Sequence, residues 1–263
     1  MVDGVTRTYR LAVPAGYRPG SPAPLLLVFH GSGSDAIQQS AYSQLPARGA
    51  ARGFLVATPD AVGGVWDLSA PGTQTPDQRF VTALIADLRR RYCVARDRID
   101  AAGISLGSQF AATMACNPAN RIAAVGLVAA EYLLRPCTGP VPVLAFHGTA
   151  DPVVPYGDGA TGRSLPGVPV VGAQENLAAW AQLDGCRPVP RIDRPAPDIV
   201  RRRWADCRAA SSVTLYSIEG GGHTWPGSPI VLPPLEFGAT TGSISATGLM
   251  LEFFGSAGST RAR

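Results

Sequence analysis

The stretch "DAAGISLGSQF", residues 100–110, decides the fold, because it passes from an apolar strand into a helix at Ser105. Glycines stand two positions before and two positions after Ser105. A sharp turn from strand to helix strains the backbone of its corner residue and tolerates only small neighbours. The pattern G-x-S-x-G therefore predicts a serine hydroxyl that stands clear of a sheet, beside the N–H groups that begin a helix.

Short apolar runs alternate with longer amphipathic stretches on both sides of this turn. Such alternation predicts an α/β chain with a mostly parallel central sheet and helices on both faces. The expected strands cover 7–14 (at an edge), 25–31, 54–60, 98–103, 123–130, 141–148 and 213–220. Helices are expected over 77–92, from Ser105 onward, over 172–186 and over 245–255. No internal repeat or long linker divides the chain, so residues 1–263 are expected to form one domain.

A nucleophilic serine needs a histidine base, and the sequence offers three histidines. His30 and His147 each follow a buried strand directly and precede a glycine, which favours a role in organising loops. His223 lies in "EGGGHTWPG", just past the strand expected over 213–220. This is the place of the base if the chain order is serine, acid, histidine.

The base needs an acid to orient it and donors for an oxyanion. Asp151, in "HGTADPVVPY", directly follows a predicted strand and precedes a proline, so it is the first candidate acid. Asp158, deeper in the same loop, and Asp184, at a predicted helix end, are the alternatives. The expected oxyanion donors are the backbone N–H of Leu106, after the nucleophile, and that of Ser32, in the Gly-rich loop "HGSGS".

Aromatic and polar residues on the site-side loops are candidates for substrate contact. Trp66 and Trp225 are expected either to form an aromatic wall at the mouth of the site or to pack as loop core. Tyr156 and Asp158 are expected at the same mouth. Trp180 and Trp204 fall on predicted regular elements and are expected to pack in the interior.

Composition narrows the possible partners. The 23 basic residues are all arginine and scattered without interleaved aromatics, so the net charge of +4 does not indicate nucleic-acid binding. No apolar run is long enough to span a membrane, and the first residues lack the apolar core of a signal peptide. The five cysteines do not form paired CxxC motifs, which disfavours zinc and suits disulfides in an exported protein. The triad chemistry needs no metal or organic cofactor, and a monomer is expected.

Stretches along nearly the whole chain carry a resemblance to a known family: "RTYRLAVP", "LLLVFHGSG", "DRIDAAGIS", "RIAAVGLVA", "VPVLAFHGTADPVVPYGDG", "VTLYSIEGGGHTWPG" and "LPPLEFGATTGSISATGLMLEFF". Through them the sequence resembles the bacterial polyhydroxybutyrate depolymerase / feruloyl esterase family of α/β-hydrolases. The resemblance implies the α/β-hydrolase fold, with Ser105 as nucleophile, Asp151 as acid and His223 as base. It also implies a secreted or periplasmic enzyme, whose leader would be absent from this sequence.

The resemblance further implies a disulfide between Cys186 and Cys207. Cys116 and Cys137 are the expected second pair, although Cys93 competes for Cys116. The sequence departs from the family after the nucleophile, where Leu106, Gly107 and Ser108 stand in place of Asn or a small residue followed by two glycines. An apolar side chain at that point puts the usual substrate in doubt.

These observations predict a serine carboxylic-ester hydrolase that works through an acyl-enzyme. The expected substrates are short-chain, aryl (feruloyl-type) or polyester compounds, such as hydroxyalkanoate oligomers or aromatic polyester. A serine peptidase of the same fold is one alternative. A catalytically inactive binding protein is another, and the complete set of Ser105, Asp151 and His223 argues against it.

Overall fold

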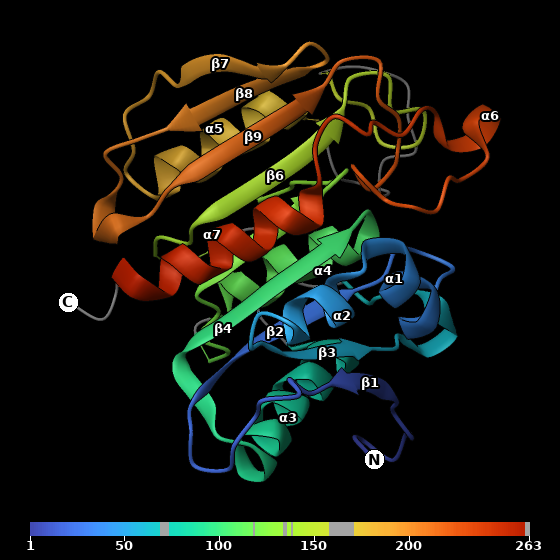
Figure 1. Cartoon of the computed structure of the whole chain (residues 1–263), viewed down its shortest axis with the longest axis vertical. Helices are drawn as coiled ribbons and strands as arrows, with labels where there is room; N and C mark the ends of the chain where they lie inside the picture. Colours follow the sequence, from blue (N-terminus) through green and yellow to red (C-terminus); the bar gives the residue numbers. More distant parts are fainter. Residues whose placement is uncertain (69–73, 118, 134–135, 138, 158–170, 261–263) are drawn as a thin grey trace.

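The strands of the protein join in one twisted sheet (Figure 1). The computed structural model describes residues 1–68, 74–117, 119–133, 136–137, 139–157 and 171–260. Along the sheet, the nine strands found in these residues have the order β1-β3-β2-β4-β5-β6-β9-β8-β7. Their bounds are β1 (Tyr9–Ala12), β2 (Ala23–Phe29), β3 (Leu55–Pro59), β4 (Val94–Ile104), β5 (Ala124–Val128), β6 (Val143–Gly148), β7 (Arg191–Ala196), β8 (Ile199–Trp204) and β9 (Val213–Ile218).

The middle of the sheet is parallel and its two edges are antiparallel. Strands β3, β2, β4, β5, β6 and β9 pair in parallel, whereas β1, β8 and β7 run against their neighbours. The carboxyl ends of the parallel strands therefore all lie along one side of the sheet, its carboxyl edge. In open α/β sheets, ligands bind at this carboxyl edge. The prediction of a mostly parallel sheet with an edge strand near residues 7–14 is confirmed.

Helices cover both faces of this sheet, as predicted. Side chains of α3 (Pro76–Arg91), α4 (Leu106–Cys116) and α5 (Ala173–Leu183) pack on one face. Those of α1 (Ala36–Ser43), α2 (Leu45–Ala50) and α7 (Ala246–Thr260) pack on the other. In Figure 1, α7 begins near the edge where the parallel strands end and runs back toward the edge where they begin. The remaining short helices are η1 (Val62–Gly64), η2 (Arg208–Ala210) and α6 (Pro234–Phe237).

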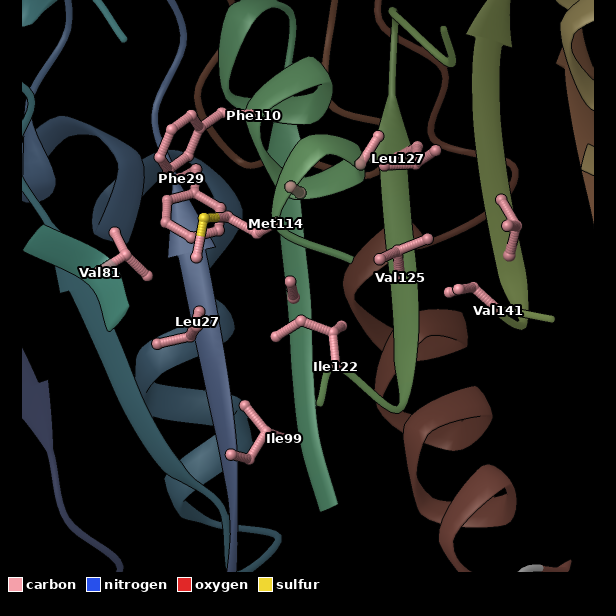
Figure 2. Packing of buried hydrophobic residues seen from close by; sticks show 14 of the residues in the cluster. Leu27, Phe29, Val81, Ile99, Phe110, Met114, Ile122, Val125, Leu127 and Val141 are labelled. Atoms are coloured by element: carbon pink, nitrogen blue, oxygen red, sulfur yellow. The ribbon is translucent and has the colours of Figure 1, made fainter. Parts of the chain in front are cut away.

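The central strands are apolar on both sides because they lie between two layers of helices. In β2, Leu25, Leu27 and Phe29 face the layer of α3 and α4, while Leu26 and Val28 face the layer of α2 and α7. All five side chains are fully buried. Figure 2 shows how Leu27 and Phe29 lie with Phe110 and Met114 of α4 in the first of these layers. This packing explains why "LLLVF" has no polar alternation.

The structure adds elements that the sequence pattern did not predict. No strand was expected in the Pro-rich stretch 187–198, but most of it belongs to a hairpin of β7 and β8 that extends the sheet beyond β9, and only the strand at Trp204 was expected. Its alternating charged side chains and prolines are compatible with an exposed edge strand. Helix α1 was also missed, although the Asp35 carboxylate caps it by accepting hydrogen bonds from the N–H groups of Ile37 and Gln38.

Both predicted disulfides are present. Cys186 is bonded to Cys207, and Cys116 is bonded to Cys137. Cys93 carries a free, half-buried thiol, so it does not compete for Cys116 in the described chain. Within the described ranges, no helix combines the length and the apolar character needed to cross a bilayer.

Candidate active site

Ser105 occupies the corner between β4 and α4. Its backbone has φ 56° and ψ −126°, a conformation in the positive-φ region that a non-glycine residue rarely adopts. Hydrogen bonds on both sides stabilise this strained conformation. The Ser105 N–H donates to the carbonyl of Val128 in β5, and the Ser105 carbonyl accepts from the N–H groups of Ser108 and Gln109 in α4. Ser105 therefore has the backbone geometry that the G-x-S-x-G pattern predicts.

The two glycines of the pattern are required by close backbone approach. A Cβ on Gly103 would lie 2.3 Å from the carbonyl oxygen of Gly107. A Cβ on Gly107 would lie 2.3 Å from the carbonyl oxygen of His30 and 2.4 Å from that of Phe29. Any side chain at these positions would push α4 away from β4 or β2. The glycines thus bring the start of α4, with its free N–H groups, against the end of β2.

Asp151 and His223 meet where β6 and β9 end side by side. The imidazole Nδ1 of His223 lies 2.8 Å from Oδ2 of Asp151. The other carboxylate oxygen of Asp151 accepts hydrogen bonds of 2.8 Å from the N–H groups of Val153 and Val154. The Asp151 side chain is completely buried, and that of His223 is 6% exposed. The structure thus brings the predicted acid and the predicted base into direct contact.

The loop that carries His223 is tied down on both sides through backbone hydrogen bonds. The His223 N–H donates to the carbonyl of Phe237, and the Gly222 N–H donates to that of Ala239. The Gly221 carbonyl accepts from Ala150, next to Asp151. A Cβ on Gly222 would lie 2.0 Å from the Phe237 carbonyl oxygen, so glycine is needed there. The Gly-rich run before His223 is therefore a close-packed segment.

The Ser105 hydroxyl makes no hydrogen bond to any described residue. Catalytic hydrogen bonds in a free enzyme are often long and tighten only when substrate binds. The N–H groups of Ser32 and Leu106 likewise find no acceptor among the described residues. Ser32 is exposed, and the next residue, Gly33, is held by a hydrogen bond to the carbonyl of Gly64. Both N–H groups are therefore free to bind an incoming oxygen.

His30 organises a loop, as predicted. Its Nδ1 lies 2.7 Å from the carbonyl oxygen of Gly31, and its Nε2 accepts from the N–H of Ala61. This pair of contacts fixes the neutral tautomer with the proton on Nδ1. Burial lowers the pKa of His30 and so favours the same neutral form. His30 thereby joins the loop after β2 to the loop after β3.

Glu131 is a buried carboxyl group that sequence reasoning did not identify. It lies in the segment after β5, and its oxygens lie 2.9 and 3.1 Å from Nδ1 of His147. His147 Nε2 in turn lies 3.4 Å from Oδ2 of Asp151, the same oxygen that contacts His223. The available signal was a single acidic residue directly after an apolar strand. It gave no indication of which histidine that residue would meet.

The prediction of an aromatic wall is wrong for both tryptophans. Trp66 is 2% exposed, stacks on Phe110 with ring centroids 4.5 Å apart, and donates its indole N–H to the His30 carbonyl. Trp225 is fully buried and donates its indole N–H to Thr247 in α7. Both are loop core, the alternative stated for them. Large aromatic residues near a Gly-rich loop are needed to pack it, and these two rings do so.

Tyr156 is half-buried, and its hydroxyl lies 2.6 Å from that of Ser217 in β9. Its ring meets the His147 ring edge to face, with centroids 5.6 Å apart. The expected contact of Tyr156 with substrate stays a prediction. Asp158 lies outside the described residues. Asp184, the other alternative acid, is buried against Val141 and Ser211 instead of a histidine.

Comparison with known sequences shows related enzymes over most of the chain. It is 31% identical to a protein of Nocardia uniformis named as an esterase, NocK, in a match that covers 96% of this chain and 80% of that protein. It is 30% identical to feruloyl esterase B of Piromyces equi, over 80% of this chain and 41% of that longer protein. No family model matches the sequence.

Several solved structures with a similar fold are named as esterases. The acetyl xylan esterase from Aspergillus awamori superposes with a TM-score of 0.61 at 16% identity, covering 82% of this chain and 88% of that one. Esterase 2 of Thermogutta terrifontis, bound to propionate, gives a TM-score of 0.59 at 16% identity over 98% and 92% of the two chains. At such low identity these similarities show the fold alone, which is that of the α/β-hydrolases.

Proposed function

Because the chain belongs to the esterase family of α/β-hydrolase fold that includes feruloyl esterases, and so is a carboxylic ester hydrolase, we propose that it acts through a Ser105, His223 and Asp151 triad. The observation that carries this proposal is the 2.8 Å contact between His223 and Asp151 at the edge where the Ser105 turn also lies. In chain order and in role, these residues follow the pattern of an α/β-hydrolase triad.

In the proposed reaction, His223 removes the proton from the Ser105 hydroxyl as its oxygen attacks the ester carbonyl carbon. The N–H groups of Leu106 and Ser32 stabilise the oxyanion of the tetrahedral intermediate. His223 then protonates the leaving alcohol, which leaves the acyl group on Ser105. Water attacks the acyl-enzyme in the same way and releases the acid. Asp151 orients the imidazole and stabilises its protonated form.

Substitution of each triad residue tests this mechanism. Ser105→Ala and His223→Ala should each lower kcat by about 10⁴-fold to 10⁶-fold in a protein that stays folded, because triad members act as a unit. Asp151→Asn should cost somewhat less. The assignment of the acid would be wrong if Asp151→Asn kept near wild-type turnover while Asp158→Asn lost it.

The substrates we propose are esters with short-chain or aryl acyl groups, including feruloyl esters, and soluble or amorphous polyester. Feruloyl esterases among the relatives support the aryl group. Exposed aliphatic side chains on the segments after β2, β3 and β9 support an apolar mouth: Ile37, Val62, Val65, Ile230, Val231 and Leu235. Such a mouth discriminates weakly, since one methylene changes apolar binding by only about 1–3 kcal/mol.

A substrate panel separates these classes. Purified protein is assayed on p-nitrophenyl acetate, methyl ferulate, a hydroxybutyrate oligomer, an amorphous aromatic polyester film and a peptide p-nitroanilide. We expect turnover of acetate and ferulate, slower release from the oligomer and film, and no amide hydrolysis. Amide hydrolysis faster than ester hydrolysis would show a peptidase, and activity on acetate alone would remove the aryl and polyester proposals.

We also propose that the enzyme works outside the cytoplasm, as one catalytic domain over residues 1–263. The two disulfides support an oxidising compartment, where such bonds persist. One sheet that runs through all the described strands supports a single domain.

A further inference from the structure

Behind the proposed triad lies a continuous row of buried ionisable side chains. Glu131 contacts Nδ1 of His147 at 2.9 Å, Nε2 of His147 lies 3.4 Å from Oδ2 of Asp151, and that oxygen contacts Nδ1 of His223 at 2.8 Å. No side chain in this row is more than 6% exposed. The row comes from the ends of three neighbouring strands, β5, β6 and β9.

Both ring nitrogens of His147 face oxygen atoms that can only accept hydrogen bonds. Nδ1 faces the Glu131 carboxylate, and Nε2 faces the carbonyl of Val154 at 3.0 Å as well as Asp151. A neutral imidazole has one N–H and one lone pair, so it would place a lone pair against one of these oxygens. Opposite a carboxylate at Glu131, the doubly protonated ring is the form that satisfies both sides of the site.

We propose that His147 is a permanently protonated positioning residue, which holds Oδ2 of Asp151 in place and disfavours a second positive charge on the neighbouring His223. This inference rests on the proposed function, because it assumes that Asp151 and His223 are the acid and the base. Glu131 is the counter-charge that allows a buried cation at this point. The proton stays on His147 throughout the reaction.

The charges around His147 agree with this assignment. Burial lowers the pKa of His147, but the charge of Glu131 and the hydrogen bonds to Asp151 and Glu131 outweigh burial and raise it to about 10. Burial raises the pKa of Asp151, but hydrogen bonds from His147 and His223 outweigh it and lower the pKa to about 2. These shifts favour an imidazolium at His147 and a carboxylate at Asp151.

The other groups around His147 do not replace its charge. The Tyr156 ring covers one side of the His147 ring. The Tyr156 hydroxyl is hydrogen-bonded to that of Ser217, which also accepts a hydrogen bond from Arg202 of β8. Burial and the charges of Glu131 and Asp151 raise the pKa of Tyr132, so that phenol stays neutral. Trp180 of α5 donates its indole N–H to the Glu131 carbonyl. His147 is thus the cation that directly contacts Asp151 from behind.

The sign of the effect on the base follows from Coulomb's law. The imidazolium of His147 lies within about 6 Å of the His223 ring, and a positive charge at that distance disfavours a second positive charge on His223. Loss of the His147 charge should therefore make His223 easier to protonate. The acid limb, which is the rise of kcat/KM with pH on the acidic side of its profile, should therefore move to higher pH. The expected shift is about one pH unit, because the charge at this distance is partly screened.

Nitrogen NMR of the histidine side chains reads the proton directly. The chain has three histidines, so the full-length protein labelled with ¹⁵N-histidine gives three imidazoles to assign. At pH 7.5 we expect two protonated nitrogens on His147 and one on His30. The signals of His147 should disappear in His147→Gln. A His147 ring with one unprotonated nitrogen at pH 7.5 would overturn the proposal.

Kinetics of His147→Gln test what the proton does. We expect kcat to fall about 10-fold to 100-fold, the range seen when a partner that orients a working side chain is lost. KM should change little, and the acid limb should move up by about one unit. Asp184→Asn is the matched control, because it neutralises a buried carboxyl away from the row and should leave the limb unmoved. If the acid limb of the kcat/KM profile stayed at its wild-type pH in His147→Gln, the role of His147 would be structural only.

Two further variants keep the result interpretable. If His147→Gln does not fold, Glu131→Gln keeps the side-chain shape and should bring the titration of His147 down into the range that NMR follows. An unchanged His147 titration in Glu131→Gln would contradict the role given to Glu131. Ser105→Ala separates the two proposals: if it is inactive while His147→Gln has the wild-type profile, the triad holds and only the inference fails.

Discussion

Single residues near the site divide into those that do chemistry and those that support it. Sequence position alone does not separate them. Trp66 and Trp225 stand on loops at the catalytic edge, yet both are buried and hydrogen-bonded. Ser105 stands on the same edge, and its hydroxyl makes no hydrogen bond to the residues that the structure describes. Burial and partners, which a sequence does not display, decide which residues can meet substrate.

Trp66→Ala should therefore act on stability and not on selectivity. Removing a buried aromatic ring that stacks on Phe110 should lower the free energy of unfolding by about 3–5 kcal/mol. Where the variant folds, activity on acetate and on aryl esters should fall by the same factor. Urea unfolding and the ratio of kcat/KM on the two esters measure these effects. Val65→Ala, at the neighbouring exposed residue, should change stability by less than about 0.5 kcal/mol. A selective loss on aryl esters at unchanged stability would restore the aromatic wall.

Asp184 should make the protein less stable as the pH rises. Burial raises its pKa to about 6, although hydrogen bonds from Ser211 and Val141 and the charge of Arg208 oppose the rise. The folded state then binds this proton more tightly than the unfolded chain between about pH 4 and pH 6, so stability falls through that window by about 3 kcal/mol. Asp184→Asn should gain this amount relative to wild type between pH 4 and pH 7.5 in urea unfolding. If the free energies of unfolding of Asp184→Asn and wild type differed by the same amount at pH 4 and at pH 7.5, the predicted effect of the Asp184 proton would be ruled out.

At the scale of elements, the parallel strands were readable because each is a short apolar run between turn signals. The β7–β8 hairpin was not readable as a unit, because β7 is mostly exposed and contains charged residues and a proline, whereas β8 buries Ile199, Val200 and Trp204. Its place depends on the antiparallel pairing of β8 with β9 and on the Cys186–Cys207 disulfide. Helix α1 has a weak apolar face, and Asp35 was its one local sign.

The Cys186–Cys207 disulfide should stabilise the hairpin without affecting catalysis. It joins two cysteines 21 positions apart, with β7 and β8 between them, and the proposed triad lies outside this segment. The double variant Cys186→Ser, Cys207→Ser should lose about 3 kcal/mol of unfolding free energy through a less constrained unfolded chain. Its kcat should stay near wild type. Cys93→Ser, which removes the free thiol, should change neither quantity. A free Cys186 thiol in a non-reducing peptide map would contradict the bond.

At the scale of the whole molecule, the meeting of Ser105, Asp151 and His223 at one side of the sheet was predictable because the parallel strands share one carboxyl edge. Each candidate in turn follows a strand, so the fold itself brings Ser105, Asp151 and His223 to that edge. The row behind the triad was not predictable. Glu131 and His147 meet only because β5 and β6 are neighbours in the sheet, and His147 read equally well as a loop organiser.

The beginning of the chain is fastened to α3 by a buried ion pair. Arg7 contacts Asp77, both side chains are at most 6% exposed, and the Arg7 guanidinium stacks 4.2 Å above the Phe80 ring. Arg7→Ala should cost about 3–5 kcal/mol, because it leaves the Asp77 charge buried and unpaired. Arg79, also on α3, forms an exposed ion pair with Asp3. Arg79→Ala breaks this pair and should lower the free energy of unfolding by about 1 kcal/mol or less. Calorimetry measures the free energy of unfolding of the two variants. Equal losses would contradict the prediction that the buried ion pair contributes more to stability than the exposed one.

The course of α7 has a practical consequence for the way this enzyme is displayed. The helix starts against the loop that carries His223, where the Ala246 N–H donates to the Pro226 carbonyl, and it runs to the opposite edge of the sheet. A protein immobilised on a bead, or joined to a fusion partner, through the far end of α7 therefore presents the catalytic edge to the surrounding solution. Attachment there leaves room for a bulky polymer surface to approach.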